Sequence, residues 1–302
     1  MGRPLSARLK SRVPLIWLVG KIGQFTASRA SKLIPGRRRD SHKGQNGRVL
    51  VIGGSAEYFG SPALAGLAAL RAGADLCTIV APRFITPTIA GYSPDLLVHS
   101  YRGDYLGSAE ISRVLGMESR VDALVIGNGL TKRPRVLRAV RSILSEWRKP
   151  VVIDADAIQP GVSLASAHAL FTPHVVEFRR LGGGTPSPDV AGRAQQVAAL
   201  ACALHAVVLL KGVTNISSDG EKTFASSTGN AGMTAGGTGD TLAGIAGAFL
   251  AQGLSPLDAA SLAAFVNGRA GALALKKFGY SLLASDLVSE IPAALQALRV
   301  PP

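Results

Sequence analysis

Short, continuous apolar runs alternate along this chain with segments rich in alanine and leucine, and glycine-bearing turns separate many of them. Residues 48–52 (RVLVI) form a β-branched run, Gly53 and Gly54 follow, and residues 63–72 are rich in alanine and leucine. Strand, glycine turn and helix in this order predict the βα unit of a parallel sheet. Because the expected strands are apolar throughout, the sheet is expected to be buried on both faces. The pattern therefore predicts an α/β fold with a mostly parallel central sheet and helices on both faces.

Glycines and polar residues collect directly after the expected strands. Further strands are expected at residues 75–81, 122–126, 150–154, 169–172 and 206–211, helices at 135–147 and 189–205, a small hairpin at 217–225, and helices from residue 241 onward. The strand ends are followed by Gly53, Gly54, Gly127, Gly129, Asp154, Asp156, Thr172–Glu177, Lys211 and Gly212. Ligands of open α/β sheets bind at the carboxyl ends of the strands, so these segments are expected to line one cleft. The first glycine turn lacks the GxGxxG spacing of a dinucleotide site.

A glycine-rich loop at residues 230–240 (NAGMTAGGTGD) leads into a small-residue apolar helix at 241–250. The first N–H groups of a helix lack intrahelical partners and lie at the positive end of its dipole. Gly236, Gly237 and Gly239 allow the backbone to approach a phosphate without obstruction by Cβ atoms. Asp240 would repel that phosphate. A carboxylate at this position is explained if it accepts a proton from an attacking hydroxyl or acts through a cation. The alternative is a glycine-rich turn with Asp240 as an ordinary N-cap.

Polar side chains at the other strand ends suit the same chemistry. Lys211 follows a buried apolar run and can neutralise a phosphate, although it can also extend to the surface. Of Asp154 and Asp156, we expect one to face the cleft, where it orients a cation or a ribose, and the other to cap a turn. His174 and Glu177 resemble a helix start. Glu177 can hold a metal-bound water, or it is a first-turn carboxylate favoured by the helix dipole.

Several common catalytic motifs are absent from the sequence. There is no Cys/His metal spacing, no GxSxG elbow and no Walker lysine motif. The residues themselves therefore predict a phosphate-handling α/β enzyme that uses a nucleoside polyphosphate, Mg²⁺ and a hydroxyl-bearing substrate, with Asp240 as the base.

The net charge of +14 belongs mostly to the N-terminal segment. Residues 1–48 contain 12 Lys+Arg and one acidic residue, whereas residues 49–302 contain 21 Lys+Arg and 18 acidic residues. A nucleic-acid-binding domain carries its charge on the folded surface, so nucleic acid is not the expected partner. We interpret residues 1–40 as a basic arm or helix, solvated or packed on a neighbouring subunit, before a single domain at 41–302. Residues 13–19 are apolar but lack the length and cleavage site of a signal peptide.

Composition bears on the cellular location and the oligomeric state of the protein. No apolar run is long enough to span a bilayer, so no membrane association is expected. Cys77 and Cys202 both lie in apolar surroundings and are interpreted as buried free thiols, which favours the reducing cytoplasm. The small-residue helices and the basic arm suit a homo-oligomer.

Five motifs occur in an order that resembles a known family. They are residues 41–55 (SHKGQNGRVLVIGGS), 153–157 (IDADA), Thr172-Pro-His174 with Glu177, 210–212 (LKG) and 230–244 (NAGMTAGGTGDTLAG). Together they resemble the ADP/ATP-dependent NAD(P)H-hydrate dehydratases of the ribokinase-like superfamily, over residues 40–295. The resemblance implies a three-layer ribokinase-like fold. It also implies that hydrated NADH or NADPH (NADHX, NADPHX) is phosphorylated on the ring hydroxyl, and that elimination of phosphate then restores the dihydropyridine.

The resemblance also implies roles for individual residues. Asp240 would be the catalytic base. The residues themselves predict Mg²⁺ as cofactor, with Glu177 in contact with it through water. The adenine nucleotide would be lined by Lys211, Gly212, Val213, Thr214, Asn215, Gly236, Gly237, Thr238 and Gly239, and the hydrate by Ser61, Gly129, His174 and Asp240. ADP, converted to AMP and phosphate, is expected ahead of ATP. The preference between NADHX and NADPHX stays open.

The chain departs from the family pattern around the expected nicotinamide pocket. The family usually has alanine at the position of Ser61, Gly-Pro-Gly-Leu-Gly where this chain has Gly127-Asn-Gly-Leu-Thr131, and Pro-Gly in place of Val175-Val176. Residues 1–40 are too short for the epimerase domain that often precedes this one. A stand-alone dehydratase of the S epimer is therefore expected, with an epimerase on another chain supplying it. The alternatives are a vitamin-alcohol or sugar kinase of the same superfamily and a nucleotide-binding regulatory module.

Overall fold

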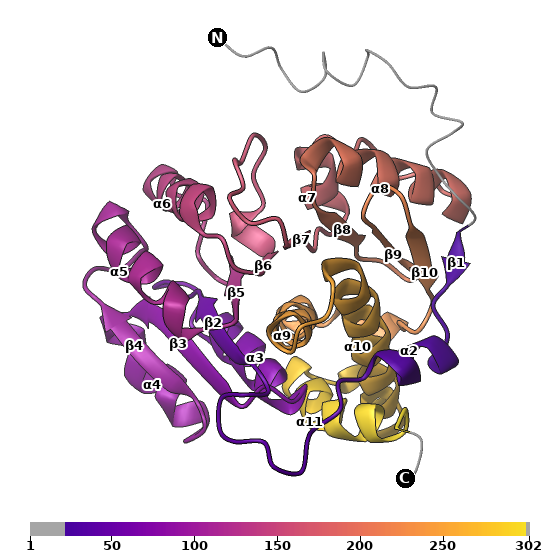
Figure 1. Ribbon diagram of the computed structural model, residues 1–302, viewed down its shortest axis with the longest axis horizontal. Coiled ribbons are helices and arrows are strands. Elements are labelled where there is room, and N and C mark those ends of the chain that lie inside the picture. The colour runs from indigo at the N-terminus through magenta and orange to yellow at the C-terminus, as the bar shows by residue number, and fades with distance from the viewer. Residues whose placement is uncertain (1–21, 300–302) are drawn as a thin grey trace.

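A single ten-stranded sheet organises the chain, whose computed structural model describes residues 22–299 (Figure 1). Its strands are β1 (Gly23–Gln24), β2 (Arg48–Ile52), β3 (Leu76–Pro82), β4 (Leu97–Tyr101), β5 (Ala123–Ile126), β6 (Val151–Ile153), β7 (Ala169–Phe171), β8 (Val207–Leu210), β9 (Asn215–Ser218) and β10 (Thr223–Ser226). Their spatial order is β1-β10-β9-β8-β7-β6-β5-β2-β3-β4. Only β9 pairs in the antiparallel sense, with β8 and with β10, so the other described strands share one direction. The predicted hairpin is therefore β9–β10.

Helices cover both faces of the sheet, which gives the three layers that were expected (Figure 1). They are α2 (Ala27–Leu33), α3 (Gly60–Arg71), α4 (Thr86–Tyr92), α5 (Ile111–Gly116), α6 (Pro134–Glu146), α7 (Val175–Arg180), α8 (Val190–Leu204), α9 (Thr238–Ala251), α10 (Pro256–Phe278) and α11 (Ala284–Gln296). Helices α2–α4 and α9–α11 pack on one face, and α5–α8 on the other. Successive strand residues serve opposite cores: Val49 and Val51 face the first group, Leu50 and Ile52 the second.

Helix α9 lies against the middle of the sheet and positions the glycine-rich loop. Most of its residues are buried, and it packs between α3, α10 and strand β5. Close approach depends on its glycines, because a Cβ at Gly244 would lie 2.0 Å from the carbonyl oxygen of Ala65. A Cβ at Gly247 would lie 2.3 Å from a methyl group of Val125. The small-residue composition of this helix is thus explained by its central place in the core.

The N-terminal segment joins the fold from residue 22 onward. Strand β1 pairs in parallel with β10 and extends the sheet by one edge strand. Phe25 is buried, with its ring centroid 5.8 Å from that of Phe265 and 6.1 Å from that of Phe224. Helix α2 packs on α10 of the same chain. The part of the predicted arm at residues 1–21 lies outside the described residues.

Two further sequence predictions concern cysteines and membranes. Cys77 is buried as expected, but the prediction that Cys202 is buried is wrong, because this residue is exposed on α8. Of its apolar neighbours in sequence, Leu200 and Ala201 are buried, whereas Ala203 is exposed like Cys202. None of the helices at residues 22–299 combines the length and hydropathy needed to cross a membrane.

Candidate functional site

The carboxyl ends of five neighbouring strands form the floor of the site, as the sequence predicts. The turns after β2, β5 and β6 approach one another so closely that side chains are excluded. A Cβ at Gly53 would lie 2.4 Å from the carbonyl oxygen of Asn128, and one at Gly127 would lie 1.8 Å from that of Asp154. Gly127 also has a φ of +129°, a backbone conformation that L side chains rarely adopt. These contacts bring the polar residues after β5 and β6 side by side.

Asp154 is the central carboxylate of the site and is almost fully buried. It accepts hydrogen bonds from Thr172 Oγ1 (2.7 Å), Lys211 Nζ (2.8 Å) and Asn128 Nδ2 (3.0 Å). These donors come from the ends of β7, β8 and β5, so Asp154 ties three strand ends together. Asp156 faces away and accepts from the backbone N–H of Thr131 (3.0 Å). The prediction that one of the two carboxylates faces the cleft and the other holds a turn is confirmed.

Asp240 lies in the first turn of α9, close to Asp154 and to Ser61 at the start of α3. Its Oδ1 accepts from Asn128 Nδ2 at 2.7 Å. Burial and, after it, the charge of Asp154 raise the pKa of Asp240 from 3.8 to about 6, a net value that already includes the opposite effects of Asn128, Ser61 and Lys211. A carboxylate with such a pKa is ionised at neutral pH and still basic enough to take a proton.

Lys211 extends from the end of β8 into the site and is not a surface lysine. Its side chain is 18% exposed, and its Nζ lies 2.8 Å from Asp154 and 4.0 Å from Glu177. Burial lowers the pKa of Lys211, but Asp154, Glu177 and Asp240 outweigh that effect and hold the pKa above its usual value. The ammonium group also lies against α9, since a Cβ at Gly239 would be 3.4 Å from Nζ. A fixed positive charge thus faces the first turn of α9.

His174 and Glu177 form the capping box of α7, as their spacing predicts. The backbone N–H of His174 donates to Glu177 Oε2 (2.8 Å), while His174 Nδ1 accepts from the N–H groups of Val176 (3.0 Å) and Glu177 (3.4 Å). An accepting Nδ1 places the proton of the neutral ring on Nε2, which lies 3.3 Å from Glu177 Oε1. Burial and Lys211 lower the pKa of His174, so the ring is neutral at pH 7. Burial raises the pKa of Glu177.

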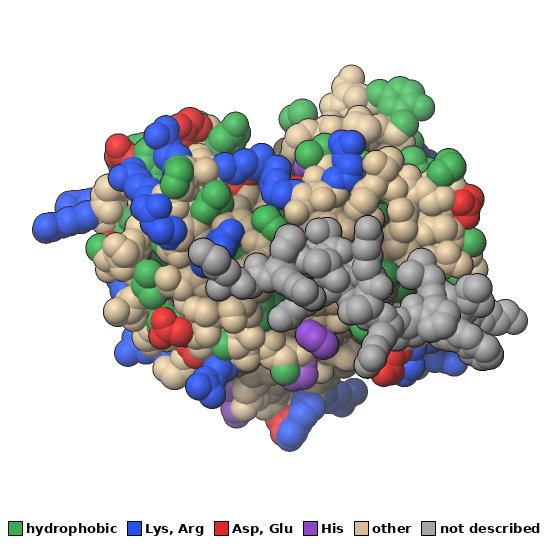
Figure 2. Space-filling view, turned by 90° about the horizontal axis from the view of Figure 1, so that it is seen from above, with side chains coloured by type: hydrophobic (Ala, Val, Ile, Leu, Met, Phe, Trp, Pro, Cys, Tyr) green, Lys and Arg blue, Asp and Glu red, His purple; other side chains and the backbone are tan. Residues whose placement is uncertain are grey.

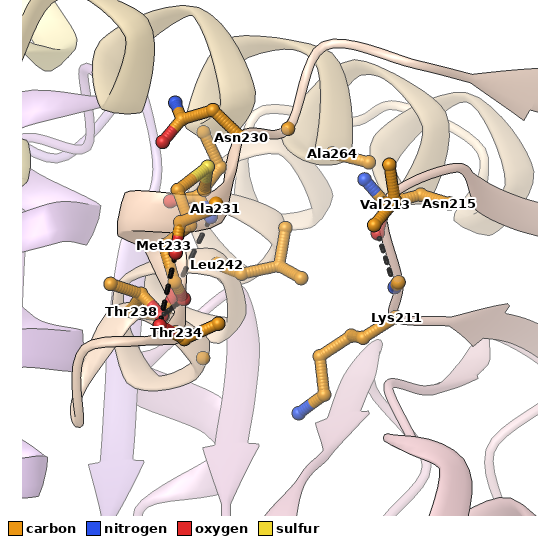
Figure 3. A pocket seen from close by; sticks show the side chains of 14 residues that line it. Lys211, Val213, Asn215, Asn230, Ala231, Met233, Thr234, Thr238, Leu242 and Ala264 are labelled. Atoms are coloured by element: carbon orange, nitrogen blue, oxygen red, sulfur yellow. Dashed lines mark hydrogen bonds between the residues drawn. The ribbon is translucent and has the colours of Figure 1, made fainter. Parts of the chain in front are cut away.

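A cavity of about 370 Å³ opens beside Lys211, between the β8–β9 turn and the glycine-rich loop (Figure 3). It is lined by Lys211, Gly212, Val213, Asn215, Gly229, Asn230, Ala231, Met233, Thr234, Thr238, Gly239, Leu242, Ala264 and Asn267. Figure 3 shows the Lys211 side chain extending between β8 and the start of α9. Six of the nine residues predicted for the nucleotide line this cavity.

The other three predicted nucleotide residues do not line the cavity. Thr214 is hydrogen-bonded to Ser227, Gly236 is exposed, and Gly237 faces Leu64 and Ala284. Gly237 is the N-cap of α9 with a φ of 94°, so its flexibility serves the turn into the helix. The sequence alone could not tell which of Gly236, Gly237 and Gly239 lines the cavity, because all three glycines belong to the same loop.

The residues predicted for the hydrate lie on two sides of Asp240. Ser61 and Gly129 are adjacent, since a Cβ at Gly129 would lie 3.3 Å from Ser61 Cβ, and the Ser61 hydroxyl lies near enough to Asp240 to lower the pKa of that carboxyl. His174 instead lies beside Glu177 and Lys211. Sequence reasoning missed Asn128 and Thr172 as contacts of the two aspartates. The available signal for Asn128 was a polar residue between two glycines directly after a buried strand.

The segment at residues 41–47, which belongs to the first of the five motifs, lies at the opposite end of the sheet from the cleft. The backbone N–H groups of Gly44 and Asn46 donate to Asp75 Oδ2 (2.9 and 3.0 Å), which precedes β3. This contact is at the amino end of the sheet, opposite the site. The segment therefore has a structural role in fixing the start of β2 against β3.

Comparison with known proteins identifies the family of this chain. A sequence model of the NAD(P)H-hydrate dehydratase family matches residues 49–293. The ADP-dependent (S)-NAD(P)H-hydrate dehydratase of Cenarchaeum symbiosum is 38% identical over 269 residues, which are 88% of this chain and 94% of that protein. The bifunctional NAD(P)H-hydrate repair enzyme of Pyrobaculum aerophilum is 40% identical over 264 residues, 86% of this chain but 52% of that protein. The chain thus spans about half the length of such bifunctional relatives.

The fold has a solved counterpart in the same family. The ADP/ATP-dependent NAD(P)H-hydrate dehydratase from Bacillus subtilis, crystallised with ATP and Mg²⁺, superposes with a TM-score of 0.81. The two sequences are 27% identical, and the match covers 92% of this chain and 99% of that one. With the family match over residues 49–293, the ribokinase-like architecture and the relatives at 38–40% identity, this chain belongs to the NAD(P)H-hydrate dehydratase family.

Proposed function

We propose that this protein uses ADP to dehydrate the S epimer of hydrated NADH or NADPH, restoring the reduced nicotinamide and releasing AMP and phosphate. One observation carries the proposal: the Asp240 carboxylate lies in the turn of α9 that also borders the cavity beside Lys211. A base and a phosphate-binding cation therefore meet at one helix start. The naming of the Cenarchaeum symbiosum relative as ADP-dependent supports ADP as the co-substrate.

The proposed reaction begins with phosphoryl transfer. Asp240 takes the proton of the ring hydroxyl as that oxygen attacks the terminal phosphorus of the nucleotide, forming the new O–P bond and releasing AMP. Lys211 and the backbone N–H groups at the start of α9 balance the charge on the transferring group. Ser61 lies beside Asp240, Gly129 lies beside Ser61, and neither lines the cavity, so the hydrate ring is assigned to this place.

The second step eliminates phosphate. Hydroxide is a poor leaving group and phosphate a good one, so phosphorylation prepares the C–O bond for cleavage. That bond breaks with loss of a proton from the adjacent ring carbon, and the double bond of the dihydropyridine returns. Nucleotide consumption is thus an activation of the hydroxyl.

Mg²⁺ fits the site only as a partner of the nucleotide. The described residues contain no group of three or more His, Cys, Asp or Glu side chains placed to hold a metal. Asp154 is already bound by Thr172, Lys211 and Asn128, and Glu177 Oε2 accepts from the His174 backbone. Mg²⁺ characteristically keeps several waters and binds substrate phosphates. It would neutralise phosphate oxygens, with Glu177 in contact through water.

The test uses hydrated NADH as the substrate and absorbance of the dihydronicotinamide band as the readout. With ADP we expect the absorbance to return in step with AMP formation, and with ATP more slowly. A lasting phosphorylated product without recovery of absorbance would instead identify a small-molecule kinase. No recovery with either nucleotide would refute the dehydratase.

Nucleic acid is not assigned as a partner. On the face shown in Figure 2, Lys and Arg side chains stand in separate groups with uncharged surface between them. A continuous basic track would be needed to follow a phosphate backbone. Turnover that depends on added nucleic acid would support the regulatory alternative.

One partner follows from the proposed activity. An enzyme limited to the S epimer needs an epimerase to convert the R epimer.

We also propose a homo-oligomer, because Phe278, Tyr280 and Leu283 expose large apolar side chains at the end of α10 and the start of α11. Light scattering at the mass of a single chain would refute the oligomer. The cytoplasm is the proposed location, supported by the free Cys77 thiol.

A further inference from the structure

Asn128 joins the two aspartates of the site through one amide group. It follows β5 between Gly127 and Gly129, and its side chain is fully buried. Nδ2 donates to Asp240 Oδ1 at 2.7 Å and to Asp154 Oδ2 at 3.0 Å. The two N–H bonds of the amide are thereby used, one on each carboxylate. The reverse orientation would place the amide oxygen against two carboxylates, so the contacts fix which atom is nitrogen.

The bridge costs the protein an unpaired acceptor. Asn128 Oδ1 is buried and has no hydrogen-bond partner among the described residues. Leaving a buried polar atom unpaired is destabilising by roughly 1–3 kcal/mol. A residue kept for stability alone would not accept that cost, because an apolar side chain of the same shape would avoid it. The two hydrogen bonds that Asn128 donates therefore explain why an asparagine occupies this position.

Those bonds act on a pair of like charges. Asp154 and Asp240 repel each other, and Lys211, the cation that faces both of them, is bound directly to Asp154. We propose, on the basis of the dehydratase function above, that Asn128 is a positioning residue whose amide holds the Asp240 carboxylate ionised and aimed at the substrate hydroxyl by bridging it to Asp154. Its role is distinct from that of Asp240, because Asn128 lies beneath the base and takes no proton.

The groups facing Asp240 come from four elements. Ser61 contributes a hydroxyl from α3, Asn128 an amide from the end of β5, Asp154 a negative charge from the end of β6 and Lys211 a positive charge from the end of β8. His174 and Glu177 from α7 face Lys211. Of these, Asn128 is the group that touches both aspartates, so its removal leaves their repulsion without a shared donor.

Two substitutions of similar size test the proposal. Asn128→Leu removes both donors, and Asn128→Asp replaces them with a third carboxylate. For the dehydration of hydrated NADH, we expect kcat at pH 8 to fall by about 10- to 100-fold while the KM values change little, since orientation is lost and binding is not. The midpoint of the acidic limb of kcat should rise by about 1–2 pH units in Asn128→Leu, the size of a lost charge-assisted hydrogen bond, and further in Asn128→Asp.

Thr172→Val is the matched control. It also removes a donor to Asp154 but leaves the contact between Asn128 and Asp240 intact. It should shift the acidic midpoint less than Asn128→Leu does. An unchanged midpoint in a folded Asn128→Leu protein, or equal shifts in Asn128→Leu and Thr172→Val, would overturn the proposal.

A second measurement does not need the substrate. Because the pKa of Asp240 is raised on folding, the unfolding free energy of the parent protein falls relative to Asp240→Asn as pH rises from about 4 to about 6. In an Asn128→Leu background the upper end of this window should move to about 7 or above. If this fall in unfolding free energy still ends at about pH 6 in the Asn128→Leu background, the proposed role of Asn128 is refuted even if the proposed reaction is correct. If the end of the fall moves to higher pH but the protein does not dehydrate hydrated NADH, the reaction is refuted and the role of Asn128 is retained.

Discussion

Asp240 is a carboxylate whose chemistry is set by its neighbours. Burial and Asp154 disfavour its charged form, whereas Lys211, Asn128 and Ser61 favour it. The balance leaves a pKa of about 6, between that of a surface aspartate and that of a carboxyl group kept neutral. A base in this range is regenerated readily after each proton transfer.

Asp240→Asn removes the base and keeps its shape. We expect kcat to fall by about 10²- to 10⁴-fold, the usual contribution of a positioned general base, with nucleotide affinity largely retained. Calorimetric titration with ADP and the absorbance assay measure the two quantities separately. Loss of both together would show that Asp240 has a structural role.

The same substitution is expected to stabilise the fold at alkaline pH. A pKa raised from 3.8 to about 6 means that the native protein buries a charge it disfavours once the pH exceeds 6. Asp240→Asn should then gain about 1–3 kcal/mol of unfolding free energy at pH 8, and little or nothing at pH 4, where Asp240 is protonated in the folded state. Urea unfolding at the two pH values measures the gain. Equal effects at both would contradict the raised pKa.

The sequence predicted several site residues and missed others for a physical reason. Asp154, Lys211 and Asp240 stand at strand ends or at a helix start, where polar side chains in apolar surroundings are conspicuous. Asn128 and Thr172 matter through side-chain contacts between different strands, and those depend on how the strands are ordered. Cys202 was misassigned because the exposed side of α8 is not visible from its apolar neighbours alone.

At the level of elements, α9 shows that one helix can serve both core and site. Its first turn holds Asp240 and Gly239, and the remainder packs against α3 and the sheet. The sequence identified the loop and the helix, and the βα order predicted the layers. It placed the start of α3 at residue 63 instead of Gly60, because Pro62 signals a break although proline is tolerated in a first helical turn.

Gly244→Ala tests the packing of α9. The added Cβ would lie 2.0 Å from the carbonyl oxygen of Ala65, so the helices must separate. We expect a loss of about 1–3 kcal/mol of unfolding free energy, typical of overpacking. Gly91→Ala in α4 is the control: nothing lies within 4 Å of its Cβ position, and a gain of about 0.5–1 kcal/mol is expected. Similar effects at both positions would contradict the close approach of α9 and α3.

For the whole molecule, the sheet order joins distant parts of the chain. The alternating pattern predicted parallel strands, but not that β5 would pair with β2 or that β1 would form an edge. A two-residue strand such as Gly23–Gln24 carries no periodicity to detect. Its place is set by the packing of Phe25 against Phe224 and Phe265, which lie 199 and 240 positions later in the sequence.

Phe25→Ala tests how firmly this edge is held. Burial of the ring between Phe224 and Phe265 implies a loss of about 3–5 kcal/mol of unfolding free energy. Phe84→Ala is the control, since that ring is 51% exposed and should change stability by less than about 0.5 kcal/mol. Denaturant midpoints of the two variants provide the comparison. A chain that begins at Ile22 retains every described contact of β1 and should unfold like the parent.

The pairing of β1 with β10 also has a consequence for synthesis on the ribosome. Gly23 pairs with Phe224, so about 200 residues must be added after β1 emerges before its partner exists. At roughly 5–20 residues per second, this strand waits about 10–40 s. During that interval Phe25 lacks the rings of Phe224 and Phe265, which pack against it in the folded protein. The nascent chain therefore completes the sheet at this edge only when most of the polypeptide has already been made.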